Sequence, residues 1–293
     1  FDFPTPQTLA SPLFTIDDGE IGYGEDPAVL KRVNLRIDSD DRIALLGANG
    51  NGKSTLLKVL AGRLKVRDGL VQKSGKLKIG YFAQHQTDEL SVDSTPLETL
   101  KKLMPKATET QVRSQLGRFG FGEDKAETRI GNLSGGEKAR LLFALISREA
   151  PHIILMDEPT NHLDVDSRQA LVQAINGYDG AVIIVTHDPH MVELTADRLW
   201  IVRHGKVERF EGDMADYRRE LLSERRNAQR ENRGTGKAVS ARNGDTGIDD
   251  GQSAEDRKRA RQASAVARAA LKPLKNKVSA AEKRVEAIQI EIN

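Results

Sequence analysis

Residues 47–54 read Gly-Ala-Asn-Gly-Asn-Gly-Lys-Ser, and they stand between an apolar run at 43–46 and a helical pattern at 55–60. This spacing fits G-x-x-x-x-G-K-[ST], the phosphate-binding P-loop. The glycines let the backbone curl so that its N–H groups face one phosphate, and the positive end of the following helix points to the same place. A glycine-rich turn that only joins a strand to a helix is the alternative. The three other fixed positions and the flanking strand and helix favour the P-loop.

The same loop carries the side chains that phosphate chemistry needs. Lys53 adds a positive charge, and the hydroxyl of Ser54 is a ligand for Mg²⁺. The sequence therefore predicts a nucleoside triphosphate site with Mg²⁺ as its cofactor. The residues expected to contact the nucleotide are Gly47, Asn49, Gly50, Gly52, Lys53, Ser54 and Thr55.

The bulk composition narrows the class of protein. The chain has 293 residues, of which 38% are apolar, and this is enough for a substantial core. It contains no apolar run of about 18 residues, so we expect no membrane partner. There are no cysteines and no secretory leader pattern, so disulfides and cysteine metal sites are excluded and a cytoplasmic location is expected. Because the chain starts with Phe1 rather than Met, we expect a piece of a longer protein.

Charge is unevenly distributed along the chain. From Ser223 to the end there are 16 Lys and Arg against 10 Asp and Glu, whereas the preceding part has 29 against 33. A solvated charged helix is the common explanation of such a basic tail. An anionic partner such as RNA or DNA is the more specific alternative, and the sequence leaves both explanations of the tail open.

Hydrophobic periodicity predicts an α/β fold with a mostly parallel core sheet, because strand and helix patterns alternate with short connections. Residues 1–13 are rich in proline without any period and predict an extended inter-domain linker. The main domain is expected at 14–226, with a small helical insert at about 94–132. Strands are expected at 13–16, 33–37, 42–46, 70–73, 77–82, 153–156, 181–186 and, as a hairpin, 199–210; helices are expected at 55–60, 136–148, after Asp164, and at 213–226.

The end of the chain has a different character. Residues 227–253 are rich in Gly, Asn, Asp and Arg and predict a disordered linker. Beyond them, apolar residues repeat at intervals of four and three, which is the a/d seam of a coiled coil that would start within 254–293. The repeat is shorter than three heptads, so it needs a partner helix. The seam consists of Leu274, Val278, Ala281, Val285, Ile288 and Ile292.

Two later strands end in side chains that suit phosphate hydrolysis. One ends in Asp157 and Glu158, an arrangement that can hold Mg²⁺ through Asp157 and place a general base at the γ-phosphate through Glu158. Another ends at His187, whose imidazole could orient the γ-phosphate and the attacking water. Gln84 follows a third strand and could meet Mg²⁺ or water. A strand that ends in a cap and a structural histidine are the alternatives for these residues.

A second glycine-containing turn opens the helix after the insert. Ser134 is a good N-cap, and Gly135 and Gly136 let the helix start approach an anion closely; Glu137 follows them. One chain cannot use both of its phosphate surfaces on one nucleotide. An ordinary turn before a helix is the alternative for these residues taken alone, but together with the other motifs they predict a second phosphate-binding surface.

Taken together, these motifs resemble an ATP-binding cassette over about residues 15–220. Five motifs occur along the chain in the order found in that family. The resemblance implies a P-loop NTPase fold with an N-terminal antiparallel β part and a helical insert, and ATP hydrolysis as the activity. The matching features are the P-loop (Walker A), Gln84 (Q-loop), residues 133–137 (signature), Asp157 and Glu158 (Walker B and catalytic base) and His187 (switch).

In that family two cassettes clamp two ATP molecules head to tail. The resemblance therefore implies that Ser134, Gly135, Gly136 and Glu137 contact the nucleotide of a sister cassette, and that the ATPase needs this partner for a complete site. It also implies that Tyr23 stacks on adenine. An ordinary tyrosine at a strand edge is the alternative for Tyr23.

Residues 158–164, Glu-Pro-Thr-Asn-His-Leu-Asp, resemble one branch of the family more than others. Transporter cassettes usually carry Ser-Ala where Asn161 and His162 stand here, whereas the Asn-His version is similar to the ABC-F family, soluble tandem-cassette ATPases that act on the ribosome. Residues 1–4 also look like the end of the linker between their cassettes. The resemblance implies a second cassette followed by the start of a Uup-like C-terminal coiled coil.

Three functions stay open from the sequence. The leading hypothesis is an ABC-F ATPase module whose ATP-dependent closure on a sister cassette regulates translation, with the ribosome or RNA as partner. The second is a nucleic-acid remodelling or repair-linked ATPase that uses the basic tail on DNA. The third is the energy subunit of a membrane transporter, against which Asn161, His162 and the coiled-coil seam count.

Overall fold

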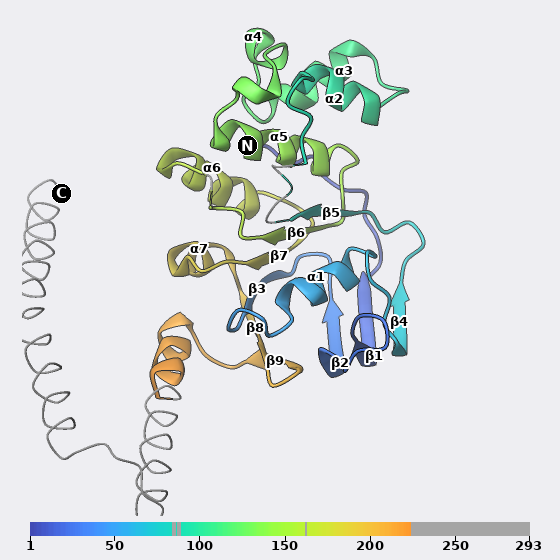
Figure 1. Ribbon diagram of the computed structural model, residues 1–293, viewed down its shortest axis with the longest axis vertical. Helices are drawn as coiled ribbons and strands as arrows, with labels where there is room; N and C mark the ends of the chain where they lie inside the picture. Colours follow the sequence, from blue (N-terminus) through green and yellow to red (C-terminus); the bar gives the residue numbers. More distant parts are fainter. Residues whose placement is uncertain (84–85, 87–88, 162, 224–293) are drawn as a thin grey trace, which may run out of the picture. The chain divides into compact units, whose positions relative to one another are not determined.

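The computed structural model describes residues 1–83, 86, 89–161 and 163–223. Within this part, two sheets and a group of short helices follow one another from the lower right to the top of Figure 1. The predicted linker at 227–253, the predicted coiled coil at 254–293 and Gln84 lie outside the described residues, so those expectations stay predictions.

The larger sheet has six strands in the order β5-β6-β7-β3-β8-β9. All neighbours are parallel except β8 and β9, which form the predicted hairpin. Every residue of β6 and β7 is buried, as expected for parallel strands covered on both faces. The strands are β3 (Arg42–Leu46), β5 (Ile79–Phe82), β6 (Ile153–Asp157), β7 (Ala181–Val185), β8 (Arg198–Arg203) and β9 (Lys206–Phe210).

The smaller sheet is antiparallel, in the order β2-β1-β4, with β1 (Phe14–Ile21), β2 (Leu30–Ile37) and β4 (Asp68–Lys73). The expected N-terminal antiparallel part is confirmed. Strand β1 is longer than the predicted 13–16. Its register shifts between Ile16 and Gly19, and Asp18 has φ 50°, so the alternation that marks a strand in a sequence is interrupted there.

Most helices fall where the periodicity predicted them, and the insert forms the upper end of Figure 1. Helix α7 was not predicted; its sequence signal is Asp188 as N-cap followed by Pro189 at the first position. The helices are α1 (Lys53–Leu60), α2 (Pro96–Leu103), α3 (Glu109–Gly117), α4 (Glu123–Ala126), η1 (Ile130–Asn132), α5 (Gly135–Ser147), α6 (Val165–Asn176) and α7 (Pro189–Thr195), and residues 214–223 are also helical.

Alternate residues of the parallel strands belong to two different cores. In β6, Ile153 and Leu155 pack in the core shared with α1 and the antiparallel sheet, whereas Ile154 and Met156 pack against α5 and the insert. Helix α1 thus lies between the two sheets, and α5 covers the other face of the larger one. This arrangement places the loop before α1 at the carboxyl end of β3.

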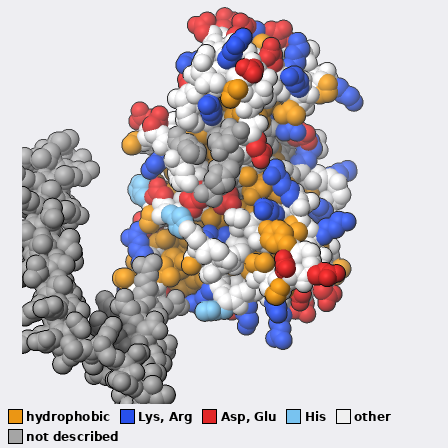
Figure 2. Space-filling view, viewed as in Figure 1, with side chains coloured by type: hydrophobic (Ala, Val, Ile, Leu, Met, Phe, Trp, Pro, Cys, Tyr) orange, Lys and Arg blue, Asp and Glu red, His pale blue; other side chains and the backbone are white. Residues whose placement is uncertain are grey.

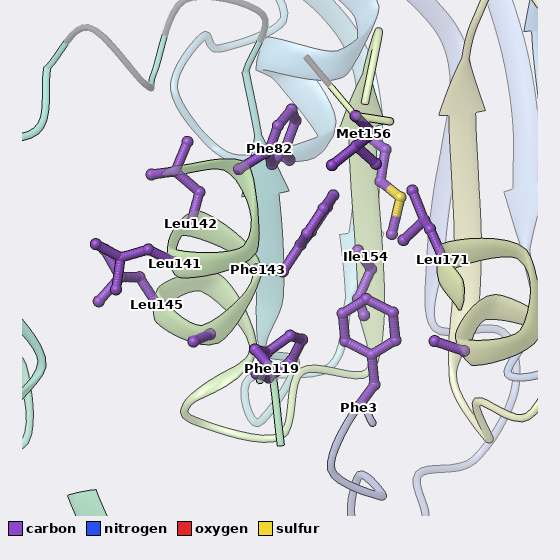
Figure 3. Packing of buried hydrophobic residues seen from close by; sticks show 14 of the residues in the cluster. Phe3, Phe82, Phe119, Leu141, Leu142, Phe143, Leu145, Ile154, Met156 and Leu171 are labelled. Carbon is purple, nitrogen blue, oxygen red and sulfur yellow. The ribbon is translucent and has the colours of Figure 1, made fainter. Parts of the chain in front are cut away.

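The N-terminal segment contributes to the core on the α5 side. Residues 1–10 have no regular secondary structure, but the Phe3 side chain is only 6% exposed. Its ring meets those of Phe119 and Phe143 edge-on at centroid distances of 5.6 and 6.2 Å (Figure 3). The segment therefore joins the insert and α5 through buried aromatic contacts.

Candidate functional site

The loop between β3 and α1 needs glycine at its two ends. Gly47 has φ 139°, and a Cβ there would lie 2.4 Å from the carbonyl oxygen of Val202. Gly52 has φ 104°, and a Cβ there would lie 2.9 Å from Cγ1 of Val29. Only glycine fits both the conformation and the space. The chain can therefore turn sharply enough to open α1 towards the carboxyl edge of the sheet.

Helix α1 begins without any side-chain cap. Its N-cap is Gly52, no side chain bonds to its first amides, and its first turn carries no acidic residue. The first N–H groups of a helix have no intrahelical partner and concentrate the positive end of the helix dipole. The start of α1 is thus suited to an anion such as a phosphate group.

A pocket of about 540 Å³ lies in front of this helix start. Ten of the residues that the sequence singled out line it, and Val29, Asn161 and Val185 add to its wall. Gly47 lies behind it, at the end of β3. The predicted residues in the lining are Tyr23, Asn49, Gly50, Gly52, Lys53, Ser54, Thr55, Asp157, Glu158 and His187.

Lys53 is buried inside the loop. Its Nζ donates hydrogen bonds to the carbonyl oxygens of Gly47 at 2.7 Å and Ala48 at 3.1 Å. Burial lowers the pKa of the Lys53 amine, and the nearby carboxylates of Glu158 and Asp157 oppose this shift. The loop therefore holds a cationic group against the two carboxylates of the pocket.

Glu158 is held at the pocket wall just after β6, with 9% of its surface exposed. Its backbone adopts φ 53°, and its N–H donates to the carbonyl of Val185 at 2.8 Å. Its Oε1 is buried and has no hydrogen-bond partner. Burial raises the pKa of the Glu158 carboxyl, and His187 and Lys53 partly oppose the rise. A carboxylate oxygen without a partner, in a group that favours protonation, can accept a proton from a neighbouring molecule.

The imidazole of His187 lies between the loop and this carboxylate. Its Nε2 is 3.2 Å from Oδ1 of Asn49 and 3.5 Å from Oε1 of Glu158. The side chain is 64% exposed, so it faces the open part of the pocket. The ring is thus placed to contact a group that sits between the loop and Glu158.

Two oxygen-bearing side chains at the pocket suit Mg²⁺. Asp157 is the buried last residue of β6, and Ser54 lies exposed in the first turn of α1. Mg²⁺ typically takes one or two protein ligands and completes its shell with phosphate oxygens and water, so two such side chains are enough to hold it.

Tyr23 stands at the pocket mouth and is 40% exposed. Its hydroxyl lies 3.3 Å from Oγ1 of Thr55 and accepts a hydrogen bond from Nζ of Lys58 at 3.4 Å. The Lys58 ammonium is also 5.5 Å from the centroid of the ring. These contacts fix an aromatic face beside the first turn of α1.

The signature residues lie elsewhere. Among the described residues that line the pocket, none comes from 134–137. The Ser134 hydroxyl accepts from the Glu137 N–H at 3.2 Å, and the Glu137 carboxylate accepts from the Ser134 N–H at 2.8 Å. The Lys125 ammonium, 2.8 Å from that carboxylate, and the Ser134 N–H hold the pKa of Glu137 below its ordinary value. The capping box therefore satisfies the Glu137 N–H at the start of α5 within the chain.

The sequence did not single out Val29 and Asn161 as pocket residues. Asn161 had a signal, because it stands three residues after Glu158 in a motif that was used only to choose the branch of the family. Val29 precedes β2 and reaches the pocket through the packing of two distant segments, so no local pattern marks it.

Known proteins that are similar in sequence indicate the family of this chain. The ABC transporter family model matches residues 30–161. "Probable ATP-binding protein YheS" of Haemophilus influenzae is 46% identical over 224 residues, which cover 75% of this chain and 35% of that protein. The chain carries an ATP-binding cassette of the ABC ATPase family.

Other relatives confirm the predicted resemblance of this ABC cassette to the ABC-F group. ABC transporter F family member 3 of Arabidopsis thaliana is 39% identical over 224 residues, covering 76% of this chain and 31% of that protein. Protein GCN20 of Saccharomyces cerevisiae is 39% identical over 222 residues, covering 76% and 30%. The chain thus spans about a third of the length of the curated relatives it matches.

A solved structure shares the fold of the ABC cassette. It is entitled "Dimeric structure of a post-hydrolysis state of the ATP-binding cassette MJ0796 bound to ADP and Pi". It has a TM-score of 0.57 and 25% identity and covers 68% of this chain and 99% of that one. Among the described residues of our chain, no helix is long and apolar enough to cross a membrane.

Proposed function

We propose that this cassette binds Mg·ATP in the pocket before α1 and hydrolyses it when a sister cassette closes over the nucleotide. The observation that carries the proposal is the buried Glu158, whose Oε1 has no hydrogen-bond partner and lies 3.5 Å from His187, in a pocket that an uncapped helix start also lines. A buried base facing a phosphate-binding helix start is what phosphate-ester hydrolysis requires.

In this proposal the loop and α1 hold the triphosphate. The free amides of the loop and of the first helical turn bind phosphate oxygens, and Lys53 supplies the positive charge. Tyr23 packs against the base at the pocket mouth. Ser54 and Asp157 would hold Mg²⁺, together with Gln84, which lies outside the described residues. Bound Mg²⁺ would neutralise phosphate charge.

Glu158 acts as the general base and His187 as the residue that orients the γ-phosphate. Burial raises the pKa of the Glu158 carboxyl above its ordinary value, and this improves its ability to accept a proton from water. Its Oε1 has no hydrogen-bond partner within the chain, so it retains the capacity to accept a bond from that water once the nucleotide is in place. The position of His187 between Asn49 and Glu158 lets it sense whether a γ-phosphate is present.

The partner supplies the second phosphate surface. The start of α5 does not line the pocket of its own chain, so Ser134, Gly135, Gly136 and Glu137 are proposed to meet the nucleotide of a sister cassette. The dimeric MJ0796 structure, whose title describes a post-hydrolysis state with ADP and Pi, supports this arrangement for a related cassette.

Glu158→Gln tests the proposed chemistry. Gln keeps the size of the side chain but cannot take a proton, so ATP turnover should fall by about 10² to 10⁴ fold while Mg·ATP still binds. Analysis of the nucleotide retained after incubation should show ATP in E158Q and ADP in the wild type. Glu193→Gln, on α7 outside the pocket, is the matched control and should behave as wild type. Wild-type turnover in E158Q would contradict the assignment.

We further propose that closure of the cassettes regulates translation at the ribosome. The relatives of the ABC-F group and the Asn161 position support this finer function. On the face shown in Figure 2, basic and acidic side chains of the described residues are interspersed. The alternative, DNA binding through the basic tail, concerns residues outside the described part of the chain.

Co-sedimentation with ribosomes tests the translation proposal. The E158Q protein, expressed from its complete gene, should pellet with ribosomes in ATP and remain in solution in ADP. Equal pelleting with both nucleotides, or salt-sensitive binding to DNA without ribosome binding, would contradict it.

A further inference from the structure

The P-loop rests on the end of strand β8. The parallel pairing of β3 with β8 runs as far as Leu46 and Ile201, so Val202 lies beside the point where the loop begins. Val202 is completely buried. Its carbonyl oxygen accepts a hydrogen bond from Nδ2 of Asn51 at 3.1 Å. The loop is thus attached from behind to a strand that contributes nothing to the lining of the pocket.

Two residues of the loop lie close to the same oxygen. Gly47 approaches it so closely that a Cβ would lie 2.4 Å away, and Asn51 binds it from four residues further along. Asn51 itself is not in the lining of the pocket, because its side chain points to the back of the loop. The bond therefore ties the back of the loop to β8, whereas Asn49, Gly50 and Gly52 of the same loop line the pocket.

The strand that provides this oxygen is itself well supported. Arg203, the next residue, pairs with Glu220 of the helical segment 214–223 and lies 3.5 Å from Glu208 of β9. At the hairpin turn, the Gly205 carbonyl accepts from the Lys31 N–H at 2.7 Å. These contacts make the hairpin of β8 and β9 a rigid support for the loop.

From this geometry we propose that Asn51 is a positioning residue for the phosphates of the nucleotide, acting through its bond to the Val202 carbonyl. The inference rests on the proposed function, and it assigns a role to a residue that the P-loop pattern leaves variable. Binding of a triphosphate needs several loop amides to point at it at once. Without the Asn51 bond the loop samples other conformations, and each binding event must first restore the right one.

The expected consequence is a loss of affinity without a loss of chemistry. Asn51→Ala removes one neutral hydrogen bond, so the Kd and KM for Mg·ATP should rise by roughly threefold to tenfold. The kcat at saturating ATP should stay at the wild-type value, because Glu158 and His187 are untouched and the bound nucleotide holds the loop in place.

Asn176→Ala is the matched control. Nδ2 of Asn176 donates to the Leu194 carbonyl, also at 3.1 Å, between α6 and α7 and away from the nucleotide pocket. The two variants lose the same kind of bond, so both should show a similar small fall in Tm. Only N51A should bind Mg·ATP more weakly in isothermal titration calorimetry.

The outcomes separate the two proposals. If the wild-type chain does not bind Mg·ATP, the proposed function fails. If the wild type binds and N51A binds equally well, or if N51A and N176A weaken binding to the same extent, the positioning role is overturned. A fall in kcat with an unchanged KM would also overturn it.

Discussion

Helices α1 and α5 both begin at glycine-containing turns that the sequence marked as phosphate surfaces, yet the two helix starts differ in structure. At α1 the N-cap is Gly52, no side chain bonds to the first amides, and the first turn has no acid. At α5 the N-cap is Ser134, and Glu137 completes a capping box in the first turn. At α1 no side chain caps the first amides, whereas at α5 a side-chain capping box stabilises the start of the helix.

This difference indicates how the two surfaces can be used. The start of α1 faces a pocket with a lysine and two carboxylates, so it can bind a triphosphate by itself. The start of α5 is exposed and has the Glu137 carboxylate beside it, so alone it is a poor anion site. It can add to a nucleotide that another cassette already holds. A half-site on each chain is the simplest account of both.

The largest expected effect concerns the support of α5. Phe3→Ala removes a buried ring that packs on Phe119 and Phe143, and the free energy of unfolding should fall by about 3 kcal/mol. Hydrogen exchange should quicken in α5 more than in α1. Phe210→Ala, which removes a half-buried ring next to Tyr217, is the control and should leave α5 protected. Equal loss of protection in both helices would show that the N-terminal segment does not specifically support α5.

The next effect compares the lysines that stand near the two helix starts. Lys53→Ala should weaken Mg·ATP binding by roughly 10- to 100-fold, because a charged donor to the phosphates is lost. Lys125→Ala breaks only the ion pair with Glu137 and should leave the affinity unchanged. Titration calorimetry on both variants checks this. Weaker binding in the Lys125 variant would contradict the separation of the two surfaces.

Ser134→Ala tests the capped helix start. Loss of the N-cap should cost about 1 kcal/mol of stability and should lower ATP turnover, with no change in the Kd for Mg·ATP. Thr108→Ala removes an equivalent capping box at α3 and should cost similar stability with normal turnover. If the two variants have the same turnover, Ser134 acts only as a cap.

The smallest effect is on the pH dependence of stability, and it concerns Glu158. Burial raises the pKa of its carboxyl above the ordinary 4.5, so the folded state binds this proton more tightly than the unfolded state. The resulting stability is complete below the unfolded pKa and is lost as pH rises through the folded pKa. Glu158→Gln should therefore raise Tm at about pH 7.5. The gain in Tm should shrink towards pH 4.5. A gain in Tm that does not depend on pH would contradict the raised pKa of Glu158.

Local patterns in the sequence were enough to predict the P-loop, the bounds of β3 and the hairpin of β8 and β9. They also predicted most of the side chains that line the pocket, including Lys53 and His187. These features depend on short-range chemistry, namely glycine conformations, apolar runs and residues at strand ends. The full length of β1 was not predictable, because the shift at Gly19 breaks its alternation.

Long-range contacts could not be predicted from the sequence for a different reason. The burial of Phe3 among Phe119 and Phe143 joins residues more than a hundred positions apart, and the bond from Asn51 to Val202 spans a similar distance. No local pattern encodes such a pair. Both contacts follow from the way the sheet brings distant segments together, so only the folded structure could reveal them.

We propose that the pocket before α1 binds a nucleotide alone but hydrolyses it only with a second cassette. The most direct test is ATP turnover per chain measured over a wide range of protein concentration, alongside the Kd for Mg·ATP. We expect one Mg·ATP per chain, with a Kd that does not depend on protein concentration, and turnover that rises as chains associate and is negligible on dilution. Full turnover per chain, constant down to concentrations at which the protein is monomeric, would contradict it.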